Sequence, residues 1–235
     1  MGQLSSSAQK SSEKPEEGKT RKQTVLNVGF LTPESIKEKH PMQVFQEWYG
    51  EAFRYGVTDP FLMMLATCGA NCKPSCRIVA LGRPDEKGFH FACQKNSKKS
   101  AQMEENSAVA ATFYWAEIKR SVRVEGHVVK TDDVTSFQAW PGDIKYAVSV
   151  GPQQGEMENY QKLVEKYKSA NLKEISDFPK PGYVQSFCLV PESVEFYQDR
   201  GPTCPNDRIL CTKVNENEEN DQKDCENWKV VRLYP

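Results

Sequence analysis

The chain has 235 residues, with 31 lysines and arginines against 32 aspartates and glutamates, so its net charge is close to zero. This length allows one domain with a substantial core. The near-neutral charge gives no electrostatic reason to expect a nucleic acid or an anionic membrane as partner, and no apolar run is long enough for a membrane span.

Residues 1–24 are predicted to form a disordered tail, and residues 25–235 a single folded domain. The tail is rich in Ser, Lys, Glu and Gln and has no apolar stretch, which argues against a secretory signal. It opens with Met1-Gly2-Gln3-Leu4-Ser5-Ser6, which fits the loose pattern for N-myristoylation. We therefore expect a cytoplasmic protein whose eight cysteines are free thiols. The three histidines have no ligand-like spacing to the cysteines, so we expect no metal site.

The apolar pattern of the folded part predicts many short strands, with helices as inserts. Helices are expected at 40–55, 98–105, 131–140 and 157–170. Strands are expected at 61–67, 75–81, 89–93, 108–115, 120–129, 182–190, 193–198, 208–212 and 228–233, and the polar run 215–226 is expected to be a loop. The first two strands are separated by a short turn and predict a hairpin. This order predicts a mainly β fold with an antiparallel barrel rather than a parallel βαβ sheet.

Positive charge at two places in the chain suits a dianionic phosphate. Arg77 stands near the start of an apolar strand, and Lys98 and Lys99 occupy the first turn of a helix whose expected N-cap is Ser97. Side-chain cations and the free backbone N–H groups of a helix start both attract anions. No glycine-rich phosphate loop is present, so neither a Rossmann nor a P-loop fold is indicated. The pattern is also typical of a solvated surface on which Arg77 pairs with a carboxylate.

Several sequence blocks, taken in order, point to a known family. They are Leu65-Ala66-Thr67, Lys73-Pro74-Ser75-Cys76-Arg77, Asn96-Ser97-Lys98-Lys99, Phe113-Tyr114-Trp115, Val122-Arg123-Val124-Glu125-Gly126, Val194-Glu195-Phe196-Tyr197-Gln198, Asp207-Arg208-Ile209 and the terminal Trp228-Lys229-Val230-Val231-Arg232-Leu233-Tyr234-Pro235. From about Pro41 to Pro235 the chain resembles the pyridoxamine 5′-phosphate oxidase family.

The resemblance implies an FMN-binding split β-barrel with a small helical subdomain. It also implies a homodimer, with a C-terminal dimerisation region at about 184–235. The implied activity is FMN-dependent oxidation of a B6 vitamer phosphate, pyridoxamine or pyridoxine 5′-phosphate, to pyridoxal 5′-phosphate. The implied cofactor-binding positions are Arg77, Ile78, Val79, Ala80, Ala92, Cys93, Lys98, Lys99, Ser121, Gln153, Gln154, Tyr197 and Arg208. Of these, Gln153 and Gln154 would reach the flavin from the partner subunit, although their segment also reads as a plain exposed loop.

Some cofactor positions depart from the family pattern. Lys98 stands where arginine is common, which would replace a bidentate contact by a point charge. Cys93 replaces a hydroxyl residue, Tyr197 a tryptophan and Ser121 a glutamine. For Tyr197 and Trp140, packing in a core or an interface is an equally good interpretation. The cofactor site is expected to be mostly kept.

The substrate positions depart more strongly. Where the family holds the substrate phosphate with lysine, tyrosine, arginine and serine, and where it has an arginine-x-histidine signature, this chain has Gly82, Ser136, Trp140, Ile144, Cys204 and Asn206. Each lost charge-assisted contact is worth roughly 1.5–3 kcal/mol, so phosphate affinity would fall by orders of magnitude.

Nearby cations could compensate for this loss. Arg83, Lys145 and Arg200 are the candidates to hold the phosphate from shifted positions. A second hypothesis is a divergent family member that binds FMN but acts on another substrate, or is a non-catalytic flavin- or B6-binding protein.

Overall fold

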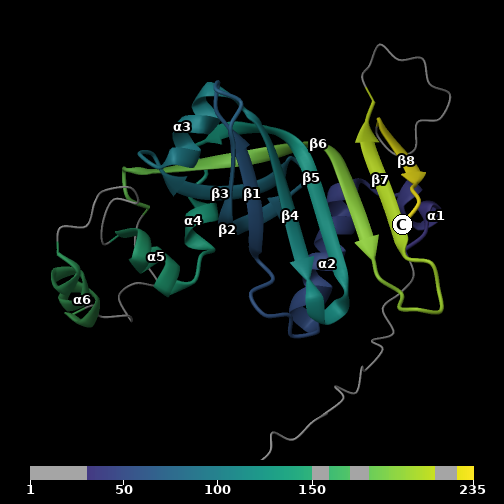
Figure 1. Cartoon of the computed structure of the whole chain (residues 1–235), viewed down its shortest axis with the longest axis horizontal. Helices are drawn as coiled ribbons and strands as arrows, with labels where there is room; N and C mark the ends of the chain where they lie inside the picture. Colours follow the sequence, from purple (N-terminus) through teal and green to yellow (C-terminus); the bar gives the residue numbers. More distant parts are fainter. Residues whose placement is uncertain (1–30, 150–158, 170–179, 215–226) are drawn as a thin grey trace, which may run out of the picture.

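The computed structural model describes residues 31–149, 159–169, 180–214 and 227–235 (Figure 1). Its strands are β1 (Leu62–Cys68), β2 (Pro74–Asp85), β3 (Gly88–Gln94), β4 (Ala108–Trp115), β5 (Arg120–Thr131), β6 (Val184–Gln198), β7 (Asp207–Lys213) and β8 (Trp228–Arg232). Its helices are α1 (Pro33–Lys37), α2 (Pro41–Arg54), α3 (Lys98–Glu105), α4 (Thr135–Gln138), α5 (Gly142–Ser149) and α6 (Tyr160–Ser169), with a 3-10 turn at Ala116–Ile118. Not one of these described helices has the length and apolar character needed to cross a membrane. The predicted tail and the predicted loop 215–226 lie outside the described residues.

The eight described strands form one antiparallel sheet that closes on itself. The strand order is β3-β2-β1-β4-β5-β6-β7-β8, and β3 also pairs with β6, so six strands make a closed barrel. The remaining two strands, β7 and β8, extend the sheet beyond the barrel. The predicted mainly β fold with an antiparallel barrel is therefore confirmed.

Strand β6 is shared by the barrel and the extension. Its first part pairs with β3 and its last part with β7, while β5 runs along both. The register of β5 against β6 shifts between Glu125 and Gly126, which allows the long strand to bend. A Cβ atom at Gly126 would collide with the carbonyl oxygen of Val190, so only glycine permits this close approach.

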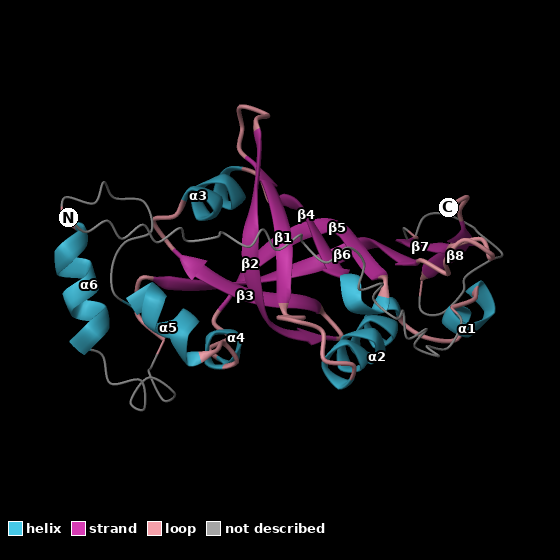
Figure 2. Cartoon of the chain, turned by 60° about the horizontal axis from the view of Figure 1, so that its bottom comes forward, coloured by secondary structure: helices cyan, strands magenta, loops and turns pink. Residues whose placement is uncertain are grey.

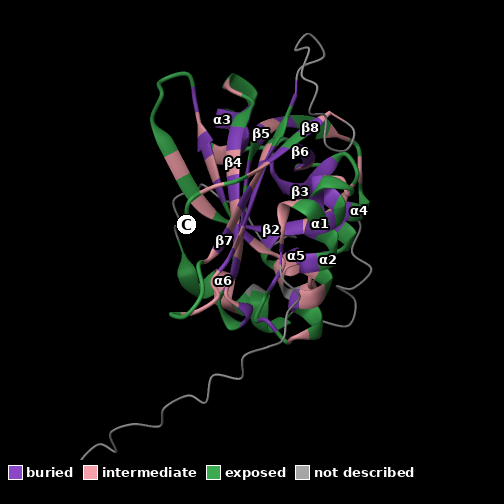
Figure 3. Ribbon diagram, turned by 90° about the vertical axis from the view of Figure 1, so that its right-hand side faces the viewer, coloured by how far each residue is buried: buried purple, intermediate pink, exposed green. Residues whose placement is uncertain are grey.

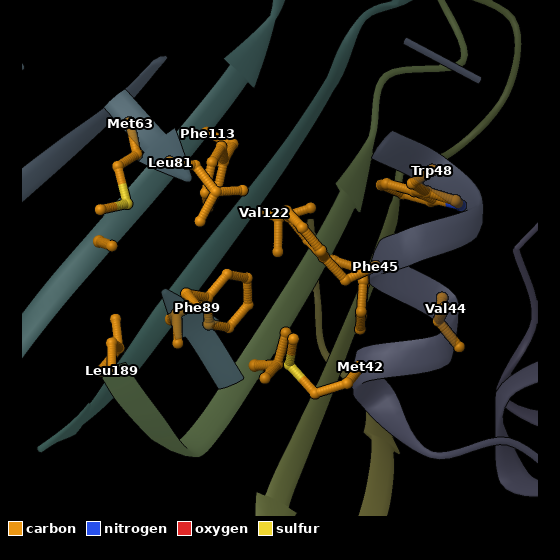
Figure 4. Packing of buried hydrophobic residues seen from close by; sticks show 14 of the residues in the cluster. Met42, Val44, Phe45, Trp48, Met63, Leu81, Phe89, Phe113, Val122 and Leu189 are labelled. Atoms are coloured by element: carbon orange, nitrogen blue, oxygen red, sulfur yellow. The ribbon is translucent and has the colours of Figure 1, made fainter. Parts of the chain in front are cut away.

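Helix α2 packs its apolar side against the barrel strands, as Figure 4 shows. Phe45 is fully buried, and its ring lies 4.7 Å from that of Phe89 and 4.9 Å from that of Phe113. Trp48, almost one helical turn later, meets Phe196 edge-on at 5.3 Å. These positions share one face of the helix, because residues three or four positions apart lie about one helical turn apart. The aromatic core therefore holds the helix to the barrel.

A buried arginine adds a polar link between α2 and the sheet. Arg120 is only 1% exposed, and its guanidinium lies 4.2 Å from the ring centre of Trp48. It forms an ion pair with Glu51, and its Nε donates a hydrogen bond to Gln198 Oε1 at 3.0 Å. Burial lowers the pKa of Arg120, and the hydrogen bond and charge of Glu51 act in the opposite direction. The charge is thus buried together with its counter-ion.

The described helices lie at different ends of the sheet. In two views, α5 and α6 lie at one end of the molecule, while α1 lies with β7 and β8 at the other (Figures 1 and 2). Buried residues follow the strands, and exposed residues dominate the loops and the outer helical surfaces (Figure 3). The rest of the molecule is thus organised around the barrel.

Several boundaries differ from those predicted. Strand β2 continues through Asp85 because it pairs with β3 as far as Gly88. The predicted helix 131–140 is reduced to α4, because β5 and β6 remain paired as far as Thr131. This ladder overrides a helical pattern that the local sequence carries.

Other elements were either merged or missed. The predicted strands 182–190 and 193–198 form the single strand β6, because a bulge at Glu192 of β6, opposite the step from Glu125 to Gly126 of β5, absorbs the bend next to Pro191. Helices α1 and α5 were not predicted. Helix α1 is one short turn with Thr32 as its N-cap, which leaves little periodic signal in the sequence.

Candidate functional site

Helix α3 begins close to the end of strand β3. Ser97 is its N-cap, with an extended backbone and an Oγ that accepts from the backbone N–H of Ser100 at 3.4 Å. Lys98 is exposed, whereas Lys99 is half-buried. The helix start thus presents backbone donors and two cations together, as the sequence predicted.

Arg77 lies on β2, opposite Leu65 of β1. One of its terminal nitrogens donates to the carbonyl oxygen of Leu65 at 3.0 Å and to Thr67 Oγ1 at 2.7 Å. The other donates to Gln102 Oε1, a residue of α3, at 3.4 Å. None of these partners is charged, and no described residue forms an ion pair with Arg77. The alternative of a surface arginine paired with a described carboxylate is therefore not what the structure contains.

The positive charges of Arg77 and Lys99 both affect the Cys93 thiol, and that of Arg77 also affects Lys99. Burial lowers the pKa of Lys99, and the charge of Arg77 lowers it further. Burial also raises the pKa of the Cys93 thiol, an effect that Lys99 and Arg77 only partly oppose. The result is a neutral thiol beside two cations, at the place where an anion would be attracted.

A pocket of about 180 Å³ adjoins this group of charges. It is lined by Leu62, Ile78, Val79, Ala80, Ala92, Cys93, Lys99, Trp140, Ile144 and Val148. Six of these residues were predicted to bind the cofactor, and Trp140 and Ile144 were predicted to bind the substrate. The structure therefore brings members of both predicted sets to one pocket, with a lysine at one side and apolar side chains around the rest.

Two further predicted substrate positions, Gly82 and Ser136, are in contact with each other. A Cβ atom at Gly82 would lie 2.5 Å from both the Cα and the carbonyl oxygen of Ser136. Ser136 is fully buried in α4, and its Oγ donates to Asp133 Oδ2 at 3.0 Å. Helix α4 thus occupies the space that a side chain at residue 82 would need.

An ionic cluster holds α4 against the β2–β3 hairpin. Arg83 contacts Asp85 at 3.0 Å and Asp133 at 3.1 Å. The buried His90 lies 2.9 Å from Asp85 and 3.5 Å from Asp133, although neither contact has hydrogen-bond geometry. Burial raises the pKa of Asp133, but hydrogen bonds from Thr135, Ser136 and Arg83 outweigh the effect of burial and bring the pKa to about 2. Asp133 therefore remains ionised at neutral pH.

The remaining predicted cofactor residues form a second group, away from the pocket. Tyr197 of β6 lies opposite Ser121 of β5 and Arg208 of β7. Ala92, at the pocket, lies opposite Ser186, and Tyr197 follows eleven residues later on the same strand. That separation corresponds to roughly 36 Å of strand. One copy of the chain does not bring the two groups to one small ligand.

The second group makes contacts of its own. The Arg208 guanidinium lies 3.1 Å from Glu195, and the Tyr197 hydroxyl accepts from Asn206 Nδ2 at 2.8 Å. Two predicted positions, Tyr197 and Asn206, are thus joined, while Cys204 is exposed. The predicted Gln153 and Gln154 lie outside the described residues.

Comparisons with known proteins place the chain in a family. Residues 49–173 match the family model described as pyridoxamine 5′-phosphate oxidase. The chain is 33% identical over 200 residues to pyridoxine/pyridoxamine 5′-phosphate oxidase of Haemophilus influenzae (strain 86-028NP), covering 84% of this chain and 90% of the relative. It is 32% identical over 205 residues to the oxidase of the same name from Ehrlichia chaffeensis, covering 84% and 99%. The chain belongs to the pyridoxamine 5′-phosphate oxidase family.

Solved structures agree with this family fold. PhzG from Burkholderia lata 383, in complex with tetrahydrophenazine-1-carboxylic acid, superposes with a TM-score of 0.72 at 19% identity, over 90% of this chain and all of that one. A pyridoxamine 5′-phosphate oxidase-related, FMN-binding protein from Nostoc punctiforme gives 0.61 at 17% identity, over 84% and 99%. At these identities the likeness shows the split-barrel fold. The family and the description of the second protein support the FMN cofactor that the sequence predicted.

Two groups of residues around the oxidase-family site were missed from the sequence. Leu62 and Val148 line the pocket, and Thr67 and Gln102 hold the Arg77 side chain. The spacing of four residues from Ile144 to Val148 would have indicated one helical face, had α5 been predicted. No local signal connects Arg77 with Gln102, because their contact depends on how α3 packs.

Proposed function

We propose that the protein binds FMN in the pocket between β2, β3 and the start of α3. The observation that carries the proposal is Arg77, whose described partners are all neutral, beside the half-buried Lys99. With Lys98 and the N-terminal N–H groups of α3, these cations would hold the cofactor phosphate. The chemistry of the donors fits such a group, since a dianion needs charge-assisted bonds at one end and the flavin ring needs apolar walls.

The activity proposed is that of an oxidase of the B6 type. Pyridoxamine or pyridoxine 5′-phosphate is the first candidate substrate and pyridoxal 5′-phosphate the product, because the curated relatives that cover most of the chain carry that activity in their names. Bound FMN would supply the hydride acceptor for this oxidation. The chain itself would bind and orient the two molecules, with Arg77 and Arg208 providing positive charge near the cofactor.

A homodimer is part of the proposal. The two groups of predicted cofactor residues are separated by roughly 36 Å of strand, so a second copy would have to supply Tyr197 and Arg208 to the first copy's pocket. The outer barrel surface also carries exposed apolar side chains. Met64 and Ile78 lie opposite each other and are 42% and 58% exposed, and Tyr114 is 67% exposed. We propose that this surface and the C-terminal region at about 184–235 form the dimer interface.

A second candidate function is supported by the contact between Gly82 and Ser136. The chain would then be a family member that keeps FMN and acts on another substrate, or binds a flavin or a B6 vitamer without catalysis. The contact leaves no room for a side chain at residue 82, and Trp140 contributes an apolar surface where a cation was expected.

The test is a visible absorption spectrum of the purified full-length protein, repeated without oxygen after addition of pyridoxamine 5′-phosphate. A flavin band that bleaches is the result expected for the oxidase. A flavin band that persists favours the second candidate. A colourless protein that cannot be reconstituted with FMN overturns the cofactor site.

A further inference from the structure

One wall of the pocket is apolar and firmly packed. Trp140, Ile144 and Val148 form this wall, at a spacing of four residues through α5 and the turn before it. Trp140 and Val148 belong to a buried cluster that includes Phe137, and the rings of Phe137 and Trp140 lie 5.2 Å apart. A wall of this kind suits the face of a flat aromatic ring and offers no charge to it.

The cations near this wall already have partners. Arg83 is paired with both Asp85 and Asp133, which neutralise its guanidinium. Lys145 is buried in α5 and also has an interaction partner. Arg200 is paired with a buried aspartate in the sheet extension. Of the three cations that could have compensated for the missing phosphate contacts, none is left unpaired within the described part of the chain.

The wall offers a ligand neither a charge nor an accessible polar atom. Trp140 is 5% exposed, and its indole Nε1 is buried without a hydrogen-bond acceptor among the described residues. A ligand in the pocket would therefore contact the indole ring rather than its N–H. A dianion placed against this wall would lose its hydration without a compensating cation.

We infer that the ligand held beside the cofactor is a flat aromatic compound without a phosphate group, and that Trp140 is the residue that determines this specificity. The inference rests on the proposed FMN site, which takes Arg77, Lys98 and Lys99 for the cofactor phosphate. It narrows the substrate to an aromatic ring that carries no phosphate, such as an unphosphorylated vitamer.

The test uses a pair of probes that differ only in the phosphate. FMN-loaded full-length protein is titrated with pyridoxamine and with pyridoxamine 5′-phosphate at one ionic strength, and binding is followed by the flavin difference spectrum and by calorimetry. Pyridoxamine is expected to bind at least as tightly as its phosphate ester. Tighter binding of the ester by about tenfold or more, the effect of one charge-assisted contact, overturns the inference.

Other outcomes separate the inference from the proposed function. If FMN stays bound and neither probe binds, the inference falls while the cofactor site stands. If the protein does not hold FMN before any probe is added, the proposed function fails, and the inference fails with it.

Variants at the wall test the specificity role directly. Trp140→Arg should raise the affinity for pyridoxamine 5′-phosphate by about tenfold or more and leave that for pyridoxamine unchanged or lower. Trp140→Phe is the matched control, which keeps an aromatic wall and should leave the ratio of the two affinities unchanged. If Trp140→Arg does not retain FMN, Ile144→Arg places the same charge on the wall at a less buried position. An unchanged ratio in a charged variant that retains FMN overturns the role of the wall.

Discussion

Gly82 of strand β2 and Ser136 of helix α4 are in backbone contact, so that a Cβ atom at residue 82 would lie 2.5 Å from the Ser136 Cα. The two residues are 54 positions apart in the sequence. Their contact places α4 directly on the barrel beside the pocket. Gly82, which was predicted to bind substrate, thus has a packing role in the fold.

Substitution of Gly82 should destabilise the fold. Gly82→Ala is expected to lower the free energy of unfolding by about 1–3 kcal/mol, because the added methyl group forces α4 away from β2. Chemical denaturation measures the change. Gly50→Ala is the control, since a Cβ there meets nothing within 4 Å and alanine favours the helical backbone of α2. Equal stability of Gly82→Ala and the parent protein would contradict the contact.

Removal of the proposed phosphate-binding cations should release FMN. Arg77→Ala, or Lys98→Ala combined with Lys99→Ala, should weaken FMN binding by about ten- to a hundredfold, the effect of one charge-assisted hydrogen bond. Flavin fluorescence during dialysis or titration measures this change. Lys87→Ala, at an exposed turn, is the control for loss of one positive charge. Stoichiometric flavin after dialysis of the Arg77 or lysine variants would exclude the proposed site.

The buried Arg120 should be important for stability rather than for binding. Arg120→Ala is expected to cost about 3–5 kcal/mol in the free energy of unfolding, because Glu51 loses its counter-ion and Trp48 its cation. Lys130→Ala is the matched control: its ion pair with Glu104 is exposed, and its loss should cost less than about 1 kcal/mol. Similar urea midpoints of unfolding for the two variants would show that the buried ion pair contributes little to stability.

Acid should weaken the attachment of α4. The pKa of Asp133 is about 2 in the folded protein against an ordinary value of 3.8, so its stabilising contribution is complete above pH 3.8 and is lost as the pH falls toward 2. The full contribution is about 2 kcal/mol. Asp133→Asn should therefore be less stable than the parent at pH 7 by about this amount, with the difference shrinking toward pH 2.

The control for this pH dependence is the neighbouring residue. Asp132→Asn removes an exposed carboxylate and should leave the loss of unfolding free energy at acid pH the same as in the parent protein. A constant difference between Asp133→Asn and the parent protein from pH 7 to pH 2 would contradict the role of the Asp133 carboxylate.

The proposed dimer can be tested on the exposed barrel surface. Met64→Lys introduces a charge beside Ile78 and should shift the protein toward a monomer with reduced FMN content, because the second group of cofactor residues would be lost with the partner. Light scattering after gel filtration measures the mass of the protein, and the flavin absorbance of the same peak measures its FMN content. Phe53→Lys adds a charge to an exposed apolar position of α2 and should leave the mass unchanged. A monomer that still binds FMN fully would contradict the shared site.

Local features of the sequence determined much of the secondary structure. Helix α3 and strand β4 have the predicted bounds, because Ser97 gives a clear N-cap and residues 108–115 alternate between buried and less buried positions. The order of such elements also predicted the antiparallel barrel, and the resemblance of the sequence blocks predicted the family. The prediction that Arg77 and Lys99 bind an anion followed from residue type and position alone.

Tertiary structure decided how these parts meet. The β3–β6 pairing closes the barrel, and the continued β5–β6 ladder shortens the helix that was predicted at 131–140. The neutral partners of Arg77 and the contact of Gly82 with Ser136 depend on residues that are distant in the chain. Hydrophobic periodicity and helix capping depend on residues close together in the chain, so they can be recognised in the sequence. The charge and space that remain at the pocket depend on long-range packing, which only the folded chain determines.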